Sequence, residues 1–240
     1  MMDEFRNVLF LDIETVAITD RYDNLDERFK AQWARKAGFF RQRDSALTDA
    51  DLFHERAGIY AEFGKIIVIA IGKLVENENG ERCLKTKYFA HHQERTLLEE
   101  FKAAIDKMDP GLRLCAHNGK EFDFPYISRR MLVQGIPLPP PFNLAGKKSW
   151  EIPHLDTLEM WKFGDYKHYT SLDLLTALFE IPSSKGELDG SQVNAAYYKT
   201  QDLKKIAEYC VGDVVAVAQL FLRLKGLPLI PPHLIQHTAP

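Results

Sequence analysis

Acidic residues stand at the edges of three apolar segments that lie far apart in this chain of 240 residues. The first two are Asp12 and Glu14, in the stretch FLDIET at residues 10–15. Residues two positions apart in a β-strand point to the same face, so these two carboxylates project together. Ligands of α/β sheets gather at the carboxyl ends of strands, which makes the pair a candidate site. A helix cap beside a solvated acid would also explain a lone pair of this kind.

Two further acids extend the set. Asp123 lies between two phenylalanines in HNGKEFDFP, at the predicted start of a helix whose positive end favours an ionised carboxylate. Taken alone, that stretch also fits a capping aspartate after an Asn-Gly turn. Asp213, in YCVGD, follows Tyr209 by four residues on the longest helical pattern, so the two share a face. The small and apolar residues of that face predict an inward-pointing Asp213, where an unpartnered carboxylate is costly.

Four inward-facing acids from separate segments predict a site for two hard divalent cations. Carboxylates and water suit Mg²⁺ or Mn²⁺, and we expect no soft thiolate ligand. Two such cations about 3.5–4 Å apart stabilise both the attacking and the leaving oxygen in phosphodiester hydrolysis. The chemistry that these residues indicate is therefore metal-dependent cleavage of a phosphodiester.

Strand and helix patterns alternate along the segments that must position these acids. Residues 20–56 are polar and helix-favouring without a strand pattern, which indicates a helical insert. The whole pattern predicts a mixed α/β sheet flanked by helices, in a single domain over residues 1–240. Strands are expected at residues 7–13, 64–74, 83–90, 113–118 and 154–157, and helices at 95–108, 124–135, 171–179 and 202–224.

Composition is that of an ordinary globular protein, with 45% hydrophobic and 27% charged residues. The net charge of −3 excludes a generally basic nucleic-acid coat but not a local site. Three widely spaced cysteines without a C-x-x-C pair argue against a zinc site and for a reducing compartment. No signal-peptide pattern and no run near the ~18 apolar residues of a membrane span are present. We expect a cytoplasmic protein without a membrane partner.

The motifs DIET, NGKEFDFPYI and YCVGD resemble the three exonuclease motifs of the DEDD superfamily of 3′–5′ exonucleases. The tyrosine of the third motif is typical of the DEDDy branch. The details of the second and third motifs look most like the proofreading domain of family B DNA polymerases. The resemblance covers about residues 6–225 and implies a ribonuclease H-like fold with a five-stranded mixed sheet. Because no polymerase domain fits in the remaining residues, it implies a free-standing exonuclease.

By this resemblance, Asp12 bridges two Mg²⁺ or Mn²⁺ ions, Glu14 and Asp213 complete the tighter site, and Asp123 supports the second ion. Tyr209 is expected to orient the attacking water, since a phenol of pKa ~10 is a poor base at neutral pH. The implied reaction releases nucleoside 5′-monophosphates from the 3′ end of single-stranded DNA.

Three other functions stay open. One is RNA processing by a 3′–5′ exoribonuclease of the same fold, and another is a catalytically inactive nucleic-acid-binding module. A phosphatase of the haloacid dehalogenase class fits less well, because its strand end carries D-x-D where this chain has D-x-E. Protein partners are unknown from the sequence.

Several residues beside the motifs are candidates for substrate contact: Thr15, Ile18, Asn118, Phe122 and Lys185. Asn118 holds either substrate or only the turn of the second motif. Ile18 either wedges against the terminal bases, as apolar residues there do in relatives, or packs in the core. Lys185 either contacts phosphate or is a solvated loop lysine. For Asp156 we favour helix capping, and for His117 a structural hydrogen bond.

The segment at residues 28–43, RFKAQWARKAGFFRQR, interleaves basic residues with aromatics. Phe29, Trp33 and Phe40 fall on one helical face. Such a segment can follow a single strand, with bases stacking on the aromatics. We favour an amphipathic helix that buries its aromatics against the domain, because aromatic stripes at helical spacing are usually core.

Overall fold

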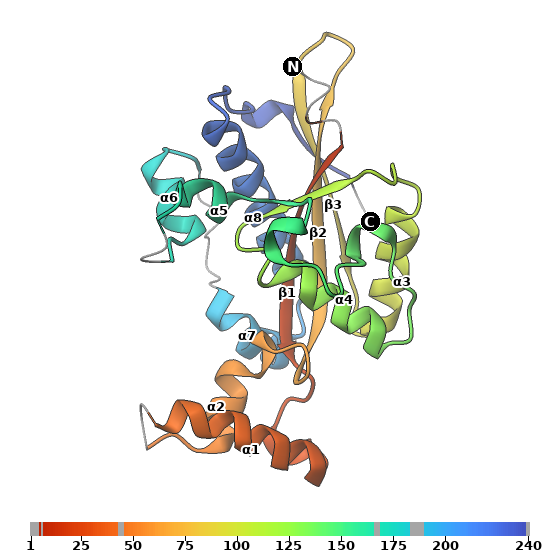
Figure 1. Ribbon diagram of the computed structural model, residues 1–240. Helices are drawn as coiled ribbons and strands as arrows, with labels where there is room; N and C mark the ends of the chain where they lie inside the picture. Colours follow the sequence, from red (N-terminus) through yellow and green to blue (C-terminus); the bar gives the residue numbers. More distant parts are fainter. Residues whose placement is uncertain (1–4, 6, 43–45, 166–168, 183–189, 239–240) are drawn as a thin grey trace.

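A mixed β-sheet forms the centre of the protein, as the computed structural model shows (Figure 1). The structure describes residues 5, 7–42, 46–165, 169–182 and 190–238. Within them the sheet has six strands in the order β5-β4-β1-β2-β3-β6. The strands are β1 (Val8–Ala17), β2 (Gly64–Glu76), β3 (Arg82–Ala90), β4 (Arg113–Ala116), β5 (Leu155–Asp156) and β6 (Ile235–His237). The predicted mixed α/β fold with flanking helices is confirmed, with one strand more than expected.

The additional strand is β6, which pairs in parallel with β3 over three residues, Ile235–His237. A strand of three residues is too short to show the alternation of polar and apolar residues by which a strand is recognised in a sequence. The other pairings are antiparallel for β1 with β2 and β2 with β3, and parallel for β4 with β1 and β5 with β4. The strand β1 is therefore internal to the sheet, which explains its nearly continuous apolar run.

Helices cover both faces of this sheet (Figure 1). On one face, α3 (Glu94–Ile105) and α4 (Asp123–Val133) pack on a cluster that includes Leu9, Leu11 and Ile69. On the other face, the long helix α8 (Leu203–Leu224) packs on Phe10 and Val68. Alternate residues of β1 thus face opposite helices, as strand geometry requires. Shorter helices complete this side of the molecule: α5 (Thr157–Lys162), α6 (Leu172–Leu178) and α7 (Val193–Thr200).

A helical arm extends from the ends of β1 and β2, at the bottom of Figure 1. We define it as α1 (Glu27–Arg41), α2 (Asp49–Arg56) and the 3₁₀ turn η2 (Ala57–Ile59). Its interior is a separate apolar cluster that contains Trp33 and Phe53. Asp26 and Thr48 cap its two helices with side-chain oxygens. The arm corresponds to the helical insert predicted from the sequence. None of the helices in the described ranges is both long and apolar enough to span a membrane.

Candidate active site

A cleft of about 610 Å³ opens beside the central residues of β1 and is bounded by α8, the start of α7 and the helical arm. Because β1 runs on to Ala17, its two acids lie within the strand and not at its end, where the sequence pattern placed them. Asp12 and Glu14 line it from β1, and Tyr209 and Asp213 line it from α8. These pairs come from segments almost 200 positions apart. The structure therefore brings together the acids of the first and third motifs, together with the tyrosine.

The two acids of β1 face α8 because they continue the row of side chains begun by Phe10. Asp12 is partly buried, and Glu14 is only 7% exposed. Burial raises the pKa of both carboxyl groups well above the ordinary range, and repulsion from Asp213 and Asp123 raises it further. A neighbouring cation would stabilise the ionised form of a carboxyl group in such a position.

The helix α8 presents Tyr209 and Asp213 on one face, one turn apart. The phenol of Tyr209 lies close to the Asp213 carboxylate. Burial, followed by repulsion from Asp213 and Glu14, raises the pKa of Tyr209 above its ordinary value of 10.0. The phenol consequently stays protonated at neutral pH and acts as a hydrogen-bond donor.

Asp123 reaches the acid cluster from the opposite face of the sheet. The strand β4 pairs with β1 only at Val8–Phe10, so the edge of β1 beyond this point is open. Asp123 begins α4 at that edge and is 4% exposed. Burial raises the pKa of Asp123 to about 7, although hydrogen bonds from the backbone amides of Asp123 and Ile13 oppose the shift. Its charge in turn contributes to the raised pKa of Asp12 and of Glu14.

Cys210 is a member of the cluster that we did not predict. Its Sγ atom lies 3.2 Å from Asp12 Oδ2, and donor atoms of Asp12, Glu14 and Cys210 all fall within 4.8 Å of one another. Burial raises the pKa of the thiol well above its ordinary value, so it stays a protonated thiol. A sulfur is thus present where only oxygens were expected. The only sequence signal was its position next to Tyr209 on the same helix.

The turn of the second motif is fixed by Asp156 rather than by a side chain of the motif itself. Asp156 accepts hydrogen bonds from the backbone amides of Asn118, at 2.9 Å, and Lys120, at 3.1 Å. It also accepts one from Leu158 at 2.9 Å, so it caps α5, as predicted. Asn118 has φ 63°, a left-handed conformation that asparagine tolerates. Its backbone holds the turn, and its side chain is not part of the cleft lining.

His117 makes the structural hydrogen bonds that we favoured for it. Its Nδ1 pairs with Thr157 Oγ1 at 2.9 Å, and its Nε2 pairs with the Thr170 carbonyl oxygen at 2.9 Å. Burial lowers the pKa of the ring, which therefore stays neutral at physiological pH. The histidine joins the end of β4 to the segment that leads into α6.

Thr15 holds the 3₁₀ turn of the helical arm against the cleft. Its hydroxyl donates to the Gly58 carbonyl oxygen at 2.8 Å, and the Tyr126 hydroxyl donates to the same oxygen at 2.8 Å. A Cβ atom at Gly58 would lie 3.2 Å from the backbone of Val16, so the turn packs directly on β1. Arg56 and Ile59, on either side of this glycine, line the cleft.

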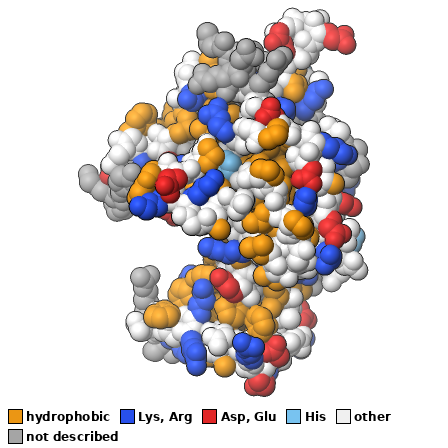
Figure 2. Space-filling model, turned by 45° about the vertical axis from the view of Figure 1, so that its right-hand side comes forward, with side chains coloured by type: hydrophobic (Ala, Val, Ile, Leu, Met, Phe, Trp, Pro, Cys, Tyr) orange, Lys and Arg blue, Asp and Glu red, His pale blue; other side chains and the backbone are white. Residues whose placement is uncertain are grey.

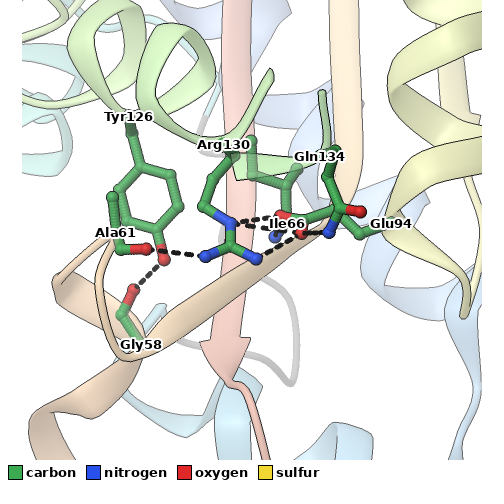
Figure 3. A network of polar contacts seen from close by, with 7 residues as sticks. All are labelled: Gly58, Ala61, Ile66, Glu94, Tyr126, Arg130 and Gln134. Atoms are coloured by element: carbon green, nitrogen blue, oxygen red, sulfur yellow. Dashed lines mark hydrogen bonds and ion pairs between the residues drawn. The ribbon is translucent and has the colours of Figure 1, made fainter. Parts of the chain in front are cut away.

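A buried ion pair behind this turn positions α4 (Figure 3). The Arg130 guanidinium donates to both Glu94 oxygens, with its shortest contact at 2.6 Å, and to the Ala61 carbonyl oxygen at 2.8 Å. Glu94 also accepts from the Ile66 amide and from Gln134 Nε2, each at 2.7 Å. The network ties α4, which begins with Asp123, to α3, β2 and the segment that follows η2.

The remaining predicted contact residues lie in different surroundings. Phe122 lines the cleft and packs on Tyr126, with ring centroids 5.4 Å apart. Ile18 packs against the apolar cluster of the arm and is not part of the cleft lining, which agrees with core packing. Lys185 lies outside the described residues.

Two comparisons with known proteins bear on this arrangement. A family model described as a predicted 3′–5′ exonuclease related to the exonuclease domain of PolB matches residues 59–228. This range includes Asp123, Tyr209 and Asp213, and it begins after Asp12 and Glu14. The fold is similar to that of the family B DNA polymerase from the hyperthermophilic archaeon Pyrobaculum calidifontis, with a TM-score of 0.55 at 14% identity over 90% of this chain. The chain spans 24% of the polymerase's length.

Proposed function

Since the chain belongs to the family of predicted 3′–5′ exonucleases related to the exonuclease domain of PolB, we propose that it is a metal-dependent exonuclease. It hydrolyses the phosphodiester at the 3′ end of single-stranded DNA and releases nucleoside 5′-monophosphates. The observation that carries the proposal is the convergence of Asp12, Glu14, Asp123 and Asp213, whose charges act on one another from three distant segments.

The donor set fits hard divalent cations. Among the described residues that line the cleft, Arg56 is the one lysine or arginine, against the acids Asp12, Glu14, Glu55 and Asp213. Such an excess of carboxylates at close range is stabilised by cations with oxygen ligands, which suits Mg²⁺ and Mn²⁺. When bound, such ions polarise a phosphoryl oxygen and lower the pKa of a coordinated water.

The residues of the chain then have separate roles. Asp12, Glu14 and Asp213 would hold one cation, and Asp12 together with Asp123 would hold a second one. Tyr209 donates a hydrogen bond and orients the attacking water, because its raised pKa leaves the phenol protonated. The Cys210 thiol donates to Asp12 and restricts the direction of that carboxylate.

Support for an unpaired substrate comes from the apolar side chains of the same cleft. Phe122 is half-buried, and Ile59 is 50% exposed although it lines the cleft. Apolar and aromatic surfaces stack on any unpaired base without reading its edge. The preference for DNA rests on the resemblance of the second and third motifs to a proofreading domain.

Oligonucleotides labelled at the 5′ or the 3′ end, DNA and RNA in parallel, test the proposal in the presence of Mg²⁺ or Mn²⁺. We expect 5′-labelled single-stranded DNA to give a ladder that shortens one nucleotide at a time, and 3′-labelled DNA to release labelled mononucleotide at once. Cleavage of a circular single strand would contradict an exonuclease. Faster degradation of RNA than of DNA would assign the substrate to RNA.

A further inference from the structure

We infer that the outward face of α1 binds the single strand on the 5′ side of the candidate active site. The inference rests on the proposed function and extends it from the terminal nucleotide to those that precede it. Its starting point is the charge of α1, which carries five basic residues and one acidic residue in a chain of net charge −3. Lys30 pairs with Glu27 and Arg41 pairs with Asp49, so the excess lies on Arg28, Arg35 and Lys36. Such a local excess suits a phosphate backbone.

The inward aromatics of α1 are used for packing, as we favoured from the sequence. Trp33 is fully buried, and Phe29 packs edge-on against Phe63 with ring centroids 6.1 Å apart although its side chain stays 38% exposed. Phe40 packs on Tyr60 with centroids 6.4 Å apart. This packing explains why the helix carries these aromatic residues. It does not explain why the helix also carries basic residues.

The outward face of α1 combines basic residues with an exposed aromatic ring. Arg28 and Arg35 are exposed, and Phe39 is 70% exposed. At 3.6 residues per turn, these three positions fall within about 40° of one another around the helix. A phenylalanine at such exposure on the same face as two arginines offers a stacking surface beside two phosphate ligands.

A continuous row of cations and rings leads from this face to the cleft. Lys36 Nζ lies 3.7 Å from the centre of the Tyr60 ring, and Tyr60 contacts Phe40. The guanidinium carbon of Arg56 lies 5.0 Å from the centre of the Phe40 ring. Arg56 in turn lines the cleft that holds the acids. Cation–π contacts of this kind hold the two cations at fixed places while leaving their outer donors free to meet a phosphate.

The shape of the molecule agrees with this path. Basic and hydrophobic side chains lie together on the surface of the arm, and the molecule is hollowed above it on one side (Figure 2). The helix α1 has 15 residues and is therefore about 22 Å long, enough to follow more than one nucleotide. An acidic cleft needs such a basic neighbour, because carboxylates alone repel the phosphates that precede the terminal one.

Binding of a fluorescein-labelled 20-mer of deoxythymidine, measured by anisotropy in EDTA over a series of NaCl concentrations, tests the inference. We expect the double variant Arg35→Gln/Lys36→Gln to raise Kd about tenfold at low salt. It should lower the slope of log Kd against log salt by about 1.4, since each phosphate contact on a single strand contributes about 0.7. Phe39→Ala should raise Kd severalfold without changing the slope, because stacking involves no counterion.

The matched control is Lys87→Gln/Lys107→Gln, which removes the same charge from a hollow between β3 and α3, away from the arm. Its Kd and salt slope should equal those of the wild type. An arm variant that binds like the wild type, or a control variant that loses as much affinity as the arm variant, would overturn the inference.

The two proposals fail separately. If the arm variant loses affinity but the wild type with Mg²⁺ or Mn²⁺ does not shorten the 20-mer, the proposed function is wrong and the binding face stands. If the wild type shortens the 20-mer and the arm variant keeps its affinity, the binding face is wrong and the proposed function stands.

Discussion

Two groups of buried or partly buried carboxylates lie in this protein, and their surroundings are opposite. Glu94 is 5% exposed and accepts hydrogen bonds from Arg130, Gln134 and the Ile66 amide, so its charge is fully partnered by the chain. Asp12 and Glu14 are surrounded by other carboxylates, and the hydrogen-bond donor found for Asp12 among the described side chains is the weak thiol of Cys210.

The difference separates acids that stabilise the fold from acids that are placed to bind a cation. A buried ion pair with all its hydrogen bonds made is destabilised when one partner is removed, because the other charge stays buried without a counter-charge. Removal of one acid from a repelling cluster has the opposite effect, since it relieves repulsion. Substitution of one partner of the ion pair should therefore lower stability. Substitution of one acid of the cleft should lower activity without lowering stability.

The largest expected effect is on activity. Asp12→Ala or Asp213→Ala should lower nuclease activity on the order of 10³-fold or more, because a direct ligand of the cation contributes several kcal/mol to the transition state. Both variants should keep the wild-type melting temperature in EDTA, or exceed it. The assay is hydrolysis of labelled single-stranded DNA, with the exposed Glu121→Ala as a control that keeps its activity. Near-wild-type hydrolysis by Asp12→Ala would contradict the assignment of the metal site.

The next effect is on stability. Arg130→Met should lower the free energy of unfolding by about 3–5 kcal/mol, because it leaves the Glu94 charge buried and unpaired. The double variant Glu94→Leu/Arg130→Met should lose less than Arg130→Met alone, since it contains no unpaired charge. Denaturant unfolding of the three proteins measures both differences. A double variant that is less stable than Arg130→Met would show that the pair stabilises by more than charge compensation.

The acids of the cleft were predictable because short-range geometry decides where they point. Spacing of two in a strand places Asp12 and Glu14 on one face, and spacing of four in a helix does the same for Tyr209 and Asp213. The buried apolar runs around them fix which face is inward. The mixed sheet followed from the same patterns.

The partnered acid and the turn beside the cleft were not predictable. Nothing local distinguishes Glu94 from Glu99 on the same helix, yet Glu94 is buried against Arg130 while Glu99 forms a surface pair with Arg95. The placement of Gly58 depends on hydroxyl groups of Thr15 and Tyr126, which are 43 and 68 positions away. Such contacts depend on how whole elements pack, which no spacing rule contains.

A smaller effect concerns Asp123 and pH. Its folded pKa of about 7 lies above the ordinary 3.8. Between these two pH values the metal-free folded protein therefore retains a proton that the unfolded chain has lost. The stability that this proton contributes is fully present below pH 4 and is lost as the pH rises through about 7. Asp123→Asn should therefore match the wild type near pH 4 and exceed it by about 1–4 kcal/mol at pH 8 in EDTA. Urea unfolding between these pH values measures the difference, and a difference that is constant with pH would contradict the shift.

The smallest effect is expected from Tyr209→Phe, and it decides whether the phenol orients water or removes its proton. Burial and the neighbouring acids raise the pKa of Tyr209, so the phenolate is scarce at any pH where the protein is assayed. The variant should then lose about tenfold in kcat, the value of one hydrogen bond to the attacking water. The pH profile of kcat should keep the shape of the wild-type profile, because no titrating group has been removed. A loss of kcat comparable with that of Asp213→Ala, together with a missing limb in the pH profile, would show that Tyr209 acts as a base. The phenol would then be as necessary for the reaction as the acids of the cleft.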